Sequence, residues 1–349
     1  MTTYDDDIEA FITSRKKATI NDVARLARLS KKTVSRVINA SPSVRAGTRD
    51  QVNAVIDRIG FRPDPQARGL AFRRSFLIGL IYDNPNAQYV VNMQLGALDG
   101  LRGSGTELVL HPCDRHSDQF IKDIRDFIEL QRLSGVIVLP PISEDKRLLA
   151  LLEDLDTPYV RVSALHPATT TGGHAILSKE RIGCRAAGEH LAQLGHTRIG
   201  FIAGPDGYLS ASERRAGFRE GLQAHGLDIE PSLEVQGDYT LESGHAAALR
   251  LLTSDTRPTA LFAGNDEMAI GAYKAAFGLG LRIPGDLSIC GYDDSPMAER
   301  VYPPLTTVHL PTRDMARAAV LTLLRSEGAP EDALIFESAL VVRQSTAKV

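Results

Sequence analysis

The chain has 349 residues, of which 43% are hydrophobic and 24% are charged, so it can form two or three globular domains. It has no run of about 18 apolar residues, and its acidic start, MTTYDDDIEAF, lacks the basic and then apolar pattern of an export signal. Three dispersed cysteines without a CxxC pair favour a reducing compartment, so we expect a cytoplasmic protein that contacts no membrane.

The net charge of −3 is distributed unevenly along the chain. Residues 1–14 hold four acids and no bases, residues 15–74 hold 15 Lys or Arg and four acids, and the remainder carries −10. A small basic segment beside a large acidic part indicates that the segment binds a polyanion. The alternative is a solvated charge run, but these bases alternate with helical apolar patterns and are not clustered in one block.

Residues 1–18 are interpreted as an N-terminal extension, acidic and then basic, and helices are predicted after it. Thr19 begins the first predicted helix, because Asp22 follows three residues later as in a capping box. Ser30 is expected to cap a second helix, in which the aliphatic residues of KKTVSRVI recur on one face.

A third helix is predicted after the loop ASPSVRAG, with Thr48 and Gln51 as its capping pair and Gly60 at its end. Three short helices with a tight turn between the first two describe a helix-turn-helix domain over residues 19–61. The second helix of such a domain enters the major groove of DNA. The alternative is a generic three-helix bundle with a solvated basic face.

The second predicted helix carries the residue types that read DNA. Arg36 can donate two parallel hydrogen bonds to guanine, and Lys31 and Lys32 can reach guanine or phosphate. Other polar side chains around this helix are suited to phosphate contacts, which position the protein without reading sequence. They are Thr19, Thr33, Ser35, Asn39 and Arg45.

The stretch TINDVARLARLSKKTVSRVINASPSVRAGTRDQVNAVIDRIGFRPDPQARGLA resembles the DNA-binding head of the LacI/GalR (lactose-repressor) family of bacterial transcription regulators. The resemblance is unbroken over residues 19–71. It implies a bacterial, nucleoid-associated regulator, in which the base-reading positions of the family fall on Lys31, Lys32 and Arg36.

Residues 62–74 are predicted to form a hinge. Asp64 can cap and Pro65 fits a first helical position, but a helix of two turns is marginal alone in water. The resemblance implies that this hinge helix pairs with its dimer mate in the minor groove, where Leu70 wedges between base pairs and Arg68 adds a DNA contact. The alternative is a proline-punctuated linker whose Leu70 packs on the rest of the chain.

From residue 75, short apolar runs alternate with amphipathic helical stretches. Runs such as FLIGLIYD, ELVLHP, GVIVLPP, RIGFIAG and ALFAGND are typical of buried strands, and SDQFIKDIRDFIELQRL and EMAIGAYKAAFGLG are typical of helices. This alternation predicts an α/β architecture of parallel sheets with helices on both faces.

The resemblance extends through this part, loosely at first and strongly from GHTRIGFIAG onward, with AGND, GYDD and PPLTTV as further motifs. It implies a two-lobed fold of the type I periplasmic-binding-protein kind, which binds the effector and dimerises. Over residues 75–349 the first lobe is expected at about 75–196 and 310–338, and the second at about 197–309 and 339–349.

Polar residues follow several predicted strands, where parallel sheets bind ligands. Amides, carboxylates, an arginine and a tyrosine suit a small polyhydroxylated ligand such as a sugar. These candidates are Asn84, Ser210, Arg214, Tyr239, Asn265, Asp266 and Asp293.

The resemblance implies roles for several of these candidates. It places effector-gripping residues at Arg214, Asn265 and Asp266. It implies a stacking aromatic at Tyr239, a pocket acid at Asp293 and a contact from the first lobe at Tyr89.

Two points in this part stay open. Helix capping is the alternative role for Asp266. Many family members carry an acid near Ser178–Lys179, so the departure ILSKERIG leaves the ligand contact at that place open.

The favoured function is a sequence-specific repressor that binds a pseudo-palindromic operator as a homodimer and is controlled by a sugar. A nucleobase or phosphosugar effector, and an effector that promotes DNA binding, stay open. The alternatives are a solute-binding protein of the transport type and an enzyme. No P-loop, G-x-S-x-G, H-E-x-x-H or dinucleotide motif is present, and no cofactor or metal site is predicted.

Overall fold

The computed structural model describes residues 4–14, 16–38, 43–61, 75–165, 174–325 and 333–349. The chain divides into two compact units, residues 1–76 and residues 77–349, which we call the head and the body. The predictions for Asn39, for the hinge at residues 62–74, and for Arg68 and Leu70 within that hinge lie outside the described residues.

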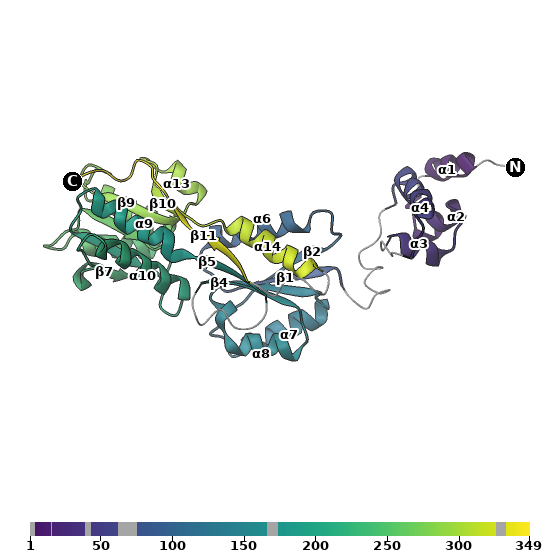
Figure 1. The fold of residues 1–349 in the computed structure, drawn as a ribbon, viewed down its shortest axis with the longest axis horizontal. Helices are drawn as coiled ribbons and strands as arrows, with labels where there is room; N and C mark the ends of the chain where they lie inside the picture. The colour runs from purple at the N-terminus through teal and green to yellow at the C-terminus, as the bar shows by residue number, and fades with distance from the viewer. Residues whose placement is uncertain (1–3, 15, 39–42, 62–74, 166–173, 326–332) are drawn as a thin grey trace. The chain divides into compact units, whose positions relative to one another are not determined.

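The described part of the head consists of short helices packed around an apolar core. They are α1 (Tyr4–Thr13), α2 (Ile20–Leu26), α3 (Lys31–Ile38) and α4 (Ala46–Ile59) (Figure 1). The predicted capping box of Thr19 and Asp22 is present at α2. The Ser30 hydroxyl accepts a hydrogen bond from the Thr33 amide at the start of α3, and Gly60 ends α4 in the left-handed region.

The predicted capping pair of the third helix is wrong. Helix α4 begins at Ala46, and its N-cap residue, Arg45, makes no side-chain capping bond. Thr48 therefore lies inside the helix. The Gln51 side chain instead donates to the Ala27 carbonyl at 3.0 Å, where it satisfies a free carbonyl at the end of α2.

The acidic extension forms a helix that the sequence patterns did not predict. In α1, Ile8 and Phe11 are buried in the core of the head, three residues apart on one face. Two acids of its first turn face bases elsewhere in the head: Asp5 pairs with Arg58 of α4, and an Asp7 oxygen lies 3.9 Å from a nitrogen of Arg28, in the turn after α2. The spacing of Ile8 and Phe11 behind a run of first-turn acids was the available signal.

The first lobe of the body is built on a six-stranded sheet with the order β11-β5-β4-β3-β1-β2 and parallel pairing throughout. Its strands are β1 (Leu77–Tyr82), β2 (Glu107–Pro112), β3 (Gly135–Val138), β4 (Tyr159–Ala164), β5 (His174–Lys179) and β11 (Leu334–Glu337). Helices α6 (Ala87–Leu101) and α14 (Thr312–Leu324) cover one face of the sheet, and α7 (Phe120–Gln131) and α8 (Lys146–Asp154) the other, with the short turn η1 (Ile142–Glu144) before α8 (Figure 1). Strand β2, expected to be buried, is an edge strand with exposed or half-exposed side chains.

The second lobe has a sheet with the order β12-β10-β9-β8-β6-β7, in which only the described β10–β12 pair is antiparallel. Its strands are β6 (Ile199–Ala203), β7 (Glu234–Gln236), β8 (Ala260–Ala263), β9 (Ser288–Asp293), β10 (Thr306–His309) and β12 (Ala339–Val341). Helices α9 (Glu180–Gln193) and α10 (Leu209–Gln223) lie on one face, and α11 (Leu241–Leu252) and α12 (Asp266–Gly278) on the other, with η3 (Pro231–Leu233) and α13 (Pro296–Arg300) in the connections.

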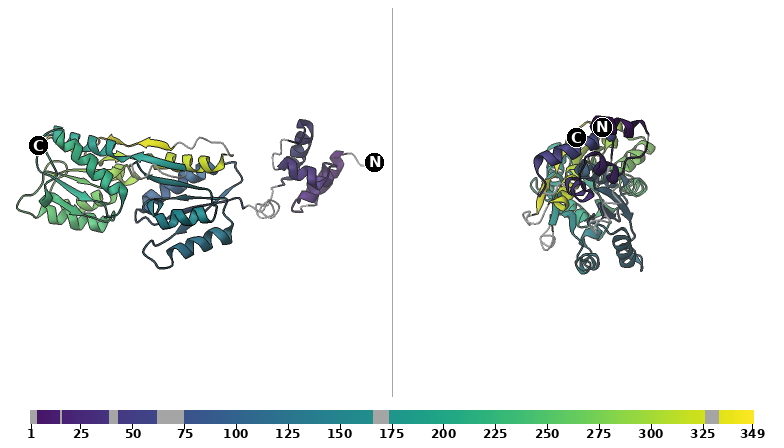
Figure 2. Two further views of the ribbon diagram at one scale, coloured as in Figure 1. Left: turned by 60° about the horizontal axis from the view of Figure 1, so that its bottom comes forward. Right: turned by 90° about the vertical axis from the view of Figure 1, so that its right-hand side faces the viewer.

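The chain passes between the lobes at three places: after β5, between β10 and α14, and between β11 and β12. Figure 2 shows the C-terminal part, in yellow, leaving the second lobe and returning to it. The Ser338 hydroxyl donates to the Lys179 carbonyl at 2.8 Å and accepts from the Gly183 amide at 3.0 Å, so two of these crossings are tied together. The predicted α/β body with largely parallel sheets and a helical head is confirmed.

Candidate functional site

The first candidate site is the outer face of α3. Lys31, Lys32 and Arg36 are exposed, while Val34 and Val37 are buried on the opposite face. The helical period therefore separates the cations from the core, and all three point to solvent. This arrangement suits insertion of a helix into a DNA groove.

The residues predicted to contact phosphate have different local roles. The Thr19 hydroxyl donates to the Asp22 carboxylate at 2.6 Å, and the Thr33 hydroxyl shares a 2.8 Å hydrogen bond with that of Ser30. Both hydroxyls thus fix helix starts. Ser35 is half-buried in α3, and Arg45 is exposed before α4.

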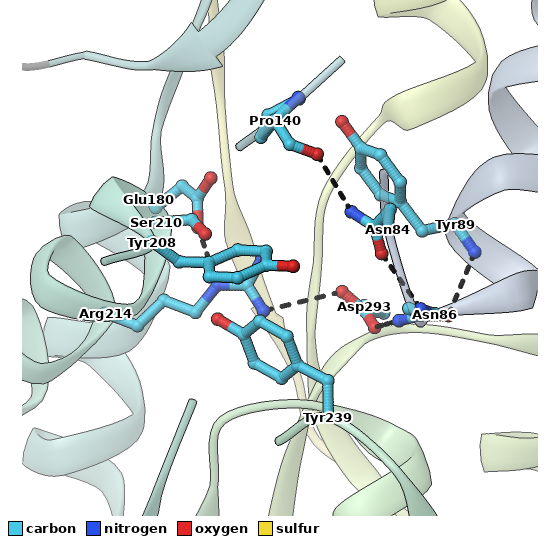
Figure 3. Close-up of a pocket in the computed structure, with 10 residues that line it drawn as sticks. All are labelled: Asn84, Asn86, Tyr89, Pro140, Glu180, Tyr208, Ser210, Arg214, Tyr239 and Asp293. Carbon is cyan, nitrogen blue, oxygen red and sulfur yellow. Dashed lines mark hydrogen bonds and ion pairs between the residues drawn. The ribbon is translucent and has the colours of Figure 1, made fainter. Parts of the chain in front are cut away.

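The second candidate site is a small, partly enclosed cavity between the lobes. It brings together six of the eight residues predicted to bind an effector: Asn84, Tyr89, Ser210, Arg214, Tyr239 and Asp293. It is also lined by Asn86, Pro140, Glu180 and Tyr208. Figure 3 shows the residues of the first lobe facing Arg214 and Tyr239 across the cavity. A concave site with few, convergent polar groups is typical of small-molecule binding.

The first lobe contributes the loop before α6. Asn86 is the N-cap of this helix, and its carbonyl oxygen Oδ1 accepts from the Tyr89 amide at 3.0 Å. The Asn86 amide nitrogen donates to Asp293 Oδ2 at 2.7 Å, which is a direct hydrogen bond between the lobes. Asn84 Nδ2 donates to the Pro140 carbonyl at 3.3 Å. These bonds orient the polar wall of the first lobe.

The second lobe contributes Arg214, which lies one turn after Ser210 on α10 and is buried. Its Nε donates to Glu180 Oε2 at 2.6 Å, and its Nη1 donates to the Gly264 carbonyl at 2.7 Å. Its guanidinium carbon lies 3.7 Å from the centre of the Tyr292 ring. Burial alone would lower the pKa of Arg214, but Glu180 and neighbouring groups raise it well above its usual value, so this residue is a permanent cation.

Asp293, at the end of β9, is the second acid of the cavity. Its Oδ1 lies 3.7 Å from Arg214 Nη1. Burial raises the pKa of Asp293 to about 6, against the opposing effect of Arg214, so the carboxylate is mostly ionised at neutral pH. Its φ of 115° is rare for a residue with a side chain, and directs the carboxylate toward Asn86.

Tyr239 is held in place by two neighbours. Its φ is 71°, and Asn265 Nδ2 donates to its carbonyl at 2.9 Å. Its ring lies against Gly204, where a Cβ would come within 2.4 Å of the Tyr239 hydroxyl oxygen. That hydroxyl is buried and has no hydrogen-bond partner among the described residues, so it can serve a ligand.

Asn265 and Asp266 do not line the cavity. Asn265 is the N-cap of α12 and braces Tyr239. Asp266 accepts from the Ser295 amide at 2.7 Å and from the Thr307 hydroxyl at 2.6 Å. Burial raises the pKa of Asp266 to about 8, and the Asp293 carboxylate acts in the same direction. Both residues therefore lie outside the cavity lining and bond to segments next to it.

Four lining residues were not among the predicted binding residues: Asn86, Pro140, Glu180 and Tyr208. Glu180 follows directly after Lys179, next to the place where the family resemblance implies an acid, so SKERIG did contain the signal. Asn86 and Tyr208 stand after predicted strands, which was also visible in the sequence. Pro140 likewise follows the predicted strand GVIVLPP, and its carbonyl accepts from Asn84 within the first lobe.

A larger groove, partly open to solvent, adjoins the cavity and shares Asn84 and Tyr208 with it. Arg115 from the first lobe lies 4.9 Å above the Tyr208 ring of the second lobe. A ligand longer than one ring therefore has space to extend outward. Among the described residues, no cluster of His, Cys, Asp or Glu could hold a metal ion, and none of the helices found there could cross a membrane.

The comparisons with known proteins match both units. Residues 19–64 match the bacterial regulatory proteins of the lacI family, and residues 189–346 match the periplasmic binding protein-like domain. The transcriptional regulator CelR of Thermobifida fusca is 32% identical to this chain over an alignment of 350 residues. The alignment covers 95% of this chain and 99% of CelR.

Two solved structures are also similar to this chain. The CelR–cellobiose complex has a TM-score of 0.71 and 31% identity, and the alignment covers 94% of this chain and 99% of that one. The Lac repressor dimer bound to operator and the anti-inducer ONPF has a TM-score of 0.78 and 31% identity, covering 95% and 100%.

Proposed function

Because this chain belongs to the LacI family of DNA-binding transcriptional regulators, with an effector-binding body, we propose that it is a repressor controlled by a sugar. It binds a pseudo-palindromic operator as a homodimer in the bacterial cytoplasm, and the sugar lowers operator affinity. Its relatives are transcriptional regulators, so the enzyme and transport alternatives are rejected.

The observation that carries the proposal is the presence of two different polar sites in one chain. The exposed cations of α3 supply the base-reading contacts at Lys31, Lys32 and Arg36. Thr19, Thr33, Ser35 and Arg45 are proposed as phosphate contacts around them. Asn39, Arg68 and Leu70, outside the described residues, are proposed as further DNA contacts.

The proposed effector site is the cavity between the lobes. Its amides, carboxylates and tyrosine hydroxyls match the donors and acceptors of sugar hydroxyls. The complex of the relative CelR with cellobiose supports a sugar. Asn84, Tyr89, Ser210, Arg214, Tyr239 and Asp293 are proposed as direct contacts, and Asn265 and Asp266 as their supports.

The proposed dimer places two heads on two half-sites of the operator, and the similar Lac repressor, which is bound to its operator as a dimer, supports this arrangement. Helix α6 has an apolar stripe suited to a second copy of the chain. Val91, Leu95 and Leu98 recur at helical spacing and are 43%, 42% and 47% exposed. The opposite face of α6 packs on α14 through Gly96 and Gly100.

The proposed control is a coupling free energy between the cavity and the operator. A sugar that binds one arrangement of the lobes more tightly shifts the population toward that arrangement. Because the coupling is reciprocal, bound operator must weaken sugar binding by the same free energy. The direct hydrogen bond between Asn86 and Asp293 and the contact of Arg115 with Tyr208 are the interlobe interactions that a ligand would replace or strengthen.

The test uses the full chain and an operator selected from random duplex DNA with inverted half-sites. Fluorescence anisotropy gives operator affinity without sugar and with each sugar that raises the melting temperature of the chain. We expect at least about a 10-fold loss of affinity with one such sugar. A sugar that binds the body but leaves operator affinity unchanged would contradict the control, and a sugar that increases affinity would make the effector a corepressor.

A further inference from the structure

The cavity contains an arginine whose charge is already matched by the protein. Arg214 is paired with Glu180 at 2.6 Å, bonded to the Gly264 carbonyl, and 3.7 Å from a carboxylate oxygen of Asp293. The Tyr292 ring covers one face of its guanidinium group. An arginine in a ligand cavity often signals an anionic ligand, but here two carboxylates compete for it.

The charges that line the cavity sum to a negative value when both acids are ionised. Glu180 and Asp293 supply two negative charges, and Arg214 supplies one positive charge. Glu144 and Arg161, which interact electrostatically outside the lining, add one charge of each sign and do not alter this balance. A ligand carboxylate or phosphate would therefore be buried beside excess negative charge, at a cost that no lining residue offsets.

A neutral polyhydroxylated ligand adds no negative charge to the cavity and avoids this cost. Its hydroxyl groups can donate to the carboxylates of Glu180 and Asp293 and can accept from amide nitrogens of the first lobe. The buried Tyr239 hydroxyl, which has no hydrogen-bond partner among the described residues, gains one. Hydrogen bonds to ionised groups are about twice as strong as those between neutral groups, so the acids favour this ligand class.

We propose that Glu180 is the charge-selecting residue of the cavity: by holding Arg214, it restricts the effector to uncharged or amino-bearing polyhydroxylated compounds and rejects uronates and sugar phosphates. This inference rests on the proposed function, in which the cavity is the effector site. It narrows the effector class beyond what the sequence implies, because the sequence leaves a phosphosugar effector open.

The experiment compares Glu180→Gln with the wild-type chain on matched ligand pairs. The pairs are D-glucose with D-glucuronate, D-galactose with D-galacturonate, and cellobiose with cellobionate, measured by thermal shift and calorimetry on the full chain. Glu189→Gln is the control, since it removes the same charge from the same helix, where Glu189 pairs with Arg185 on the surface at 2.8 Å. Asp293→Asn is a second test variant, because an amide oxygen can still accept from Asn86.

We expect the wild-type chain to bind the neutral member of at least one pair at least about 10-fold more tightly than the acid, and Glu189→Gln to keep that ratio. Glu180→Gln and Asp293→Asn should each shift the ratio toward the acid by about 10-fold or more. The inference is overturned if an acid binds the wild type as tightly as its neutral partner, if no neutral sugar binds, or if both test variants keep the wild-type ratio.

Operator binding in the same samples separates this inference from the proposed function. A neutral sugar that binds selectively but leaves operator affinity unchanged supports the charge selection and contradicts the control of DNA binding. A uronate that binds the wild type and releases the operator supports the control and overturns the charge selection.

Discussion

The head and the body pack their helices in different ways. In the head, helices α1 to α4 meet through apolar side chains, and a Cβ added at Gly47 or Gly60 would meet no atom within 4 Å. In the body, helix pairs approach backbone to backbone: a Cβ at Gly96 of α6 would lie 2.0 Å from the Arg313 carbonyl oxygen of α14. A contact of this kind leaves no room for a side chain at Gly96.

The head and the body also differ in the burial of their functional charges. The head exposes its functional cations, Lys31, Lys32 and Arg36, to solvent, where a charge costs little. The body buries Arg214 and must neutralise it with Glu180 and Asp293. Loss of a charge should therefore change binding in the head but change both stability and binding in the body.

The largest effect is expected from Arg214→Met in the body. This change leaves the Glu180 carboxylate buried without its partner, so the free energy of unfolding of the body should fall by about 3–5 kcal/mol. Urea unfolding followed by circular dichroism measures it. The double variant Glu180→Gln/Arg214→Met should recover at least half of the loss, and equal stability of the two variants would refute the pairing argument.

Charge reversal on α3 should affect DNA binding alone. Lys32→Glu with Arg36→Glu should weaken operator binding by about 100- to 1000-fold, equivalent to about 3–4 kcal/mol, and leave the melting temperature unchanged because both side chains are exposed. The control Arg250→Glu with Lys274→Glu makes the same net change on exposed residues of the body. Unchanged operator occupancy in the α3 variant would remove the basis for DNA reading by this helix.

Helix α1 should be part of the folded head. Ile8→Ala should destabilise the head by about 2–3 kcal/mol, because Ile8 is fully buried. Ile12→Ala on the same helix should have an effect below about 0.5 kcal/mol, since Ile12 is 49% exposed. Amide hydrogen exchange over residues 20–59 of the intact chain measures both. Equal exchange rates in the two variants would mean that α1 does not stabilise the other helices.

Replacing a glycine with alanine should change stability in opposite directions in the two regions. Gly96→Ala should destabilise the body by about 1–2 kcal/mol, because α6 must move away from α14. Gly47→Ala, in the first turn of α4, should stabilise the head by up to about 1 kcal/mol through the lower entropy of its unfolded chain. Thermal unfolding of the full chain and hydrogen exchange distinguish the two effects, and the same sign in both would contradict the packing difference.

The head could be predicted closely because its determinants are local. Capping residues such as Thr19 and Ser30, a 3.6-residue apolar period and a glycine at position 60 each act within one or two helical turns. The prediction was wrong at Thr48 and Gln51, because the Gln51 side chain bonds to α2, 24 residues away, and does not cap its own helix. It missed α1, because the burial of Ile8 and Phe11 requires helices that are folded from later residues.

The amino-acid sequence was sufficient to predict the alternation of strands and helices, the basic face of α3 and most of the polar residues that end in the cavity. The folded chain was needed to show that Glu180 neutralises Arg214 and that Asn265 and Asp266 stand behind the cavity wall. This division arises because strand ends are marked locally, whereas the direction of each side chain depends on positive φ angles, on glycine contacts and on three crossings between lobes.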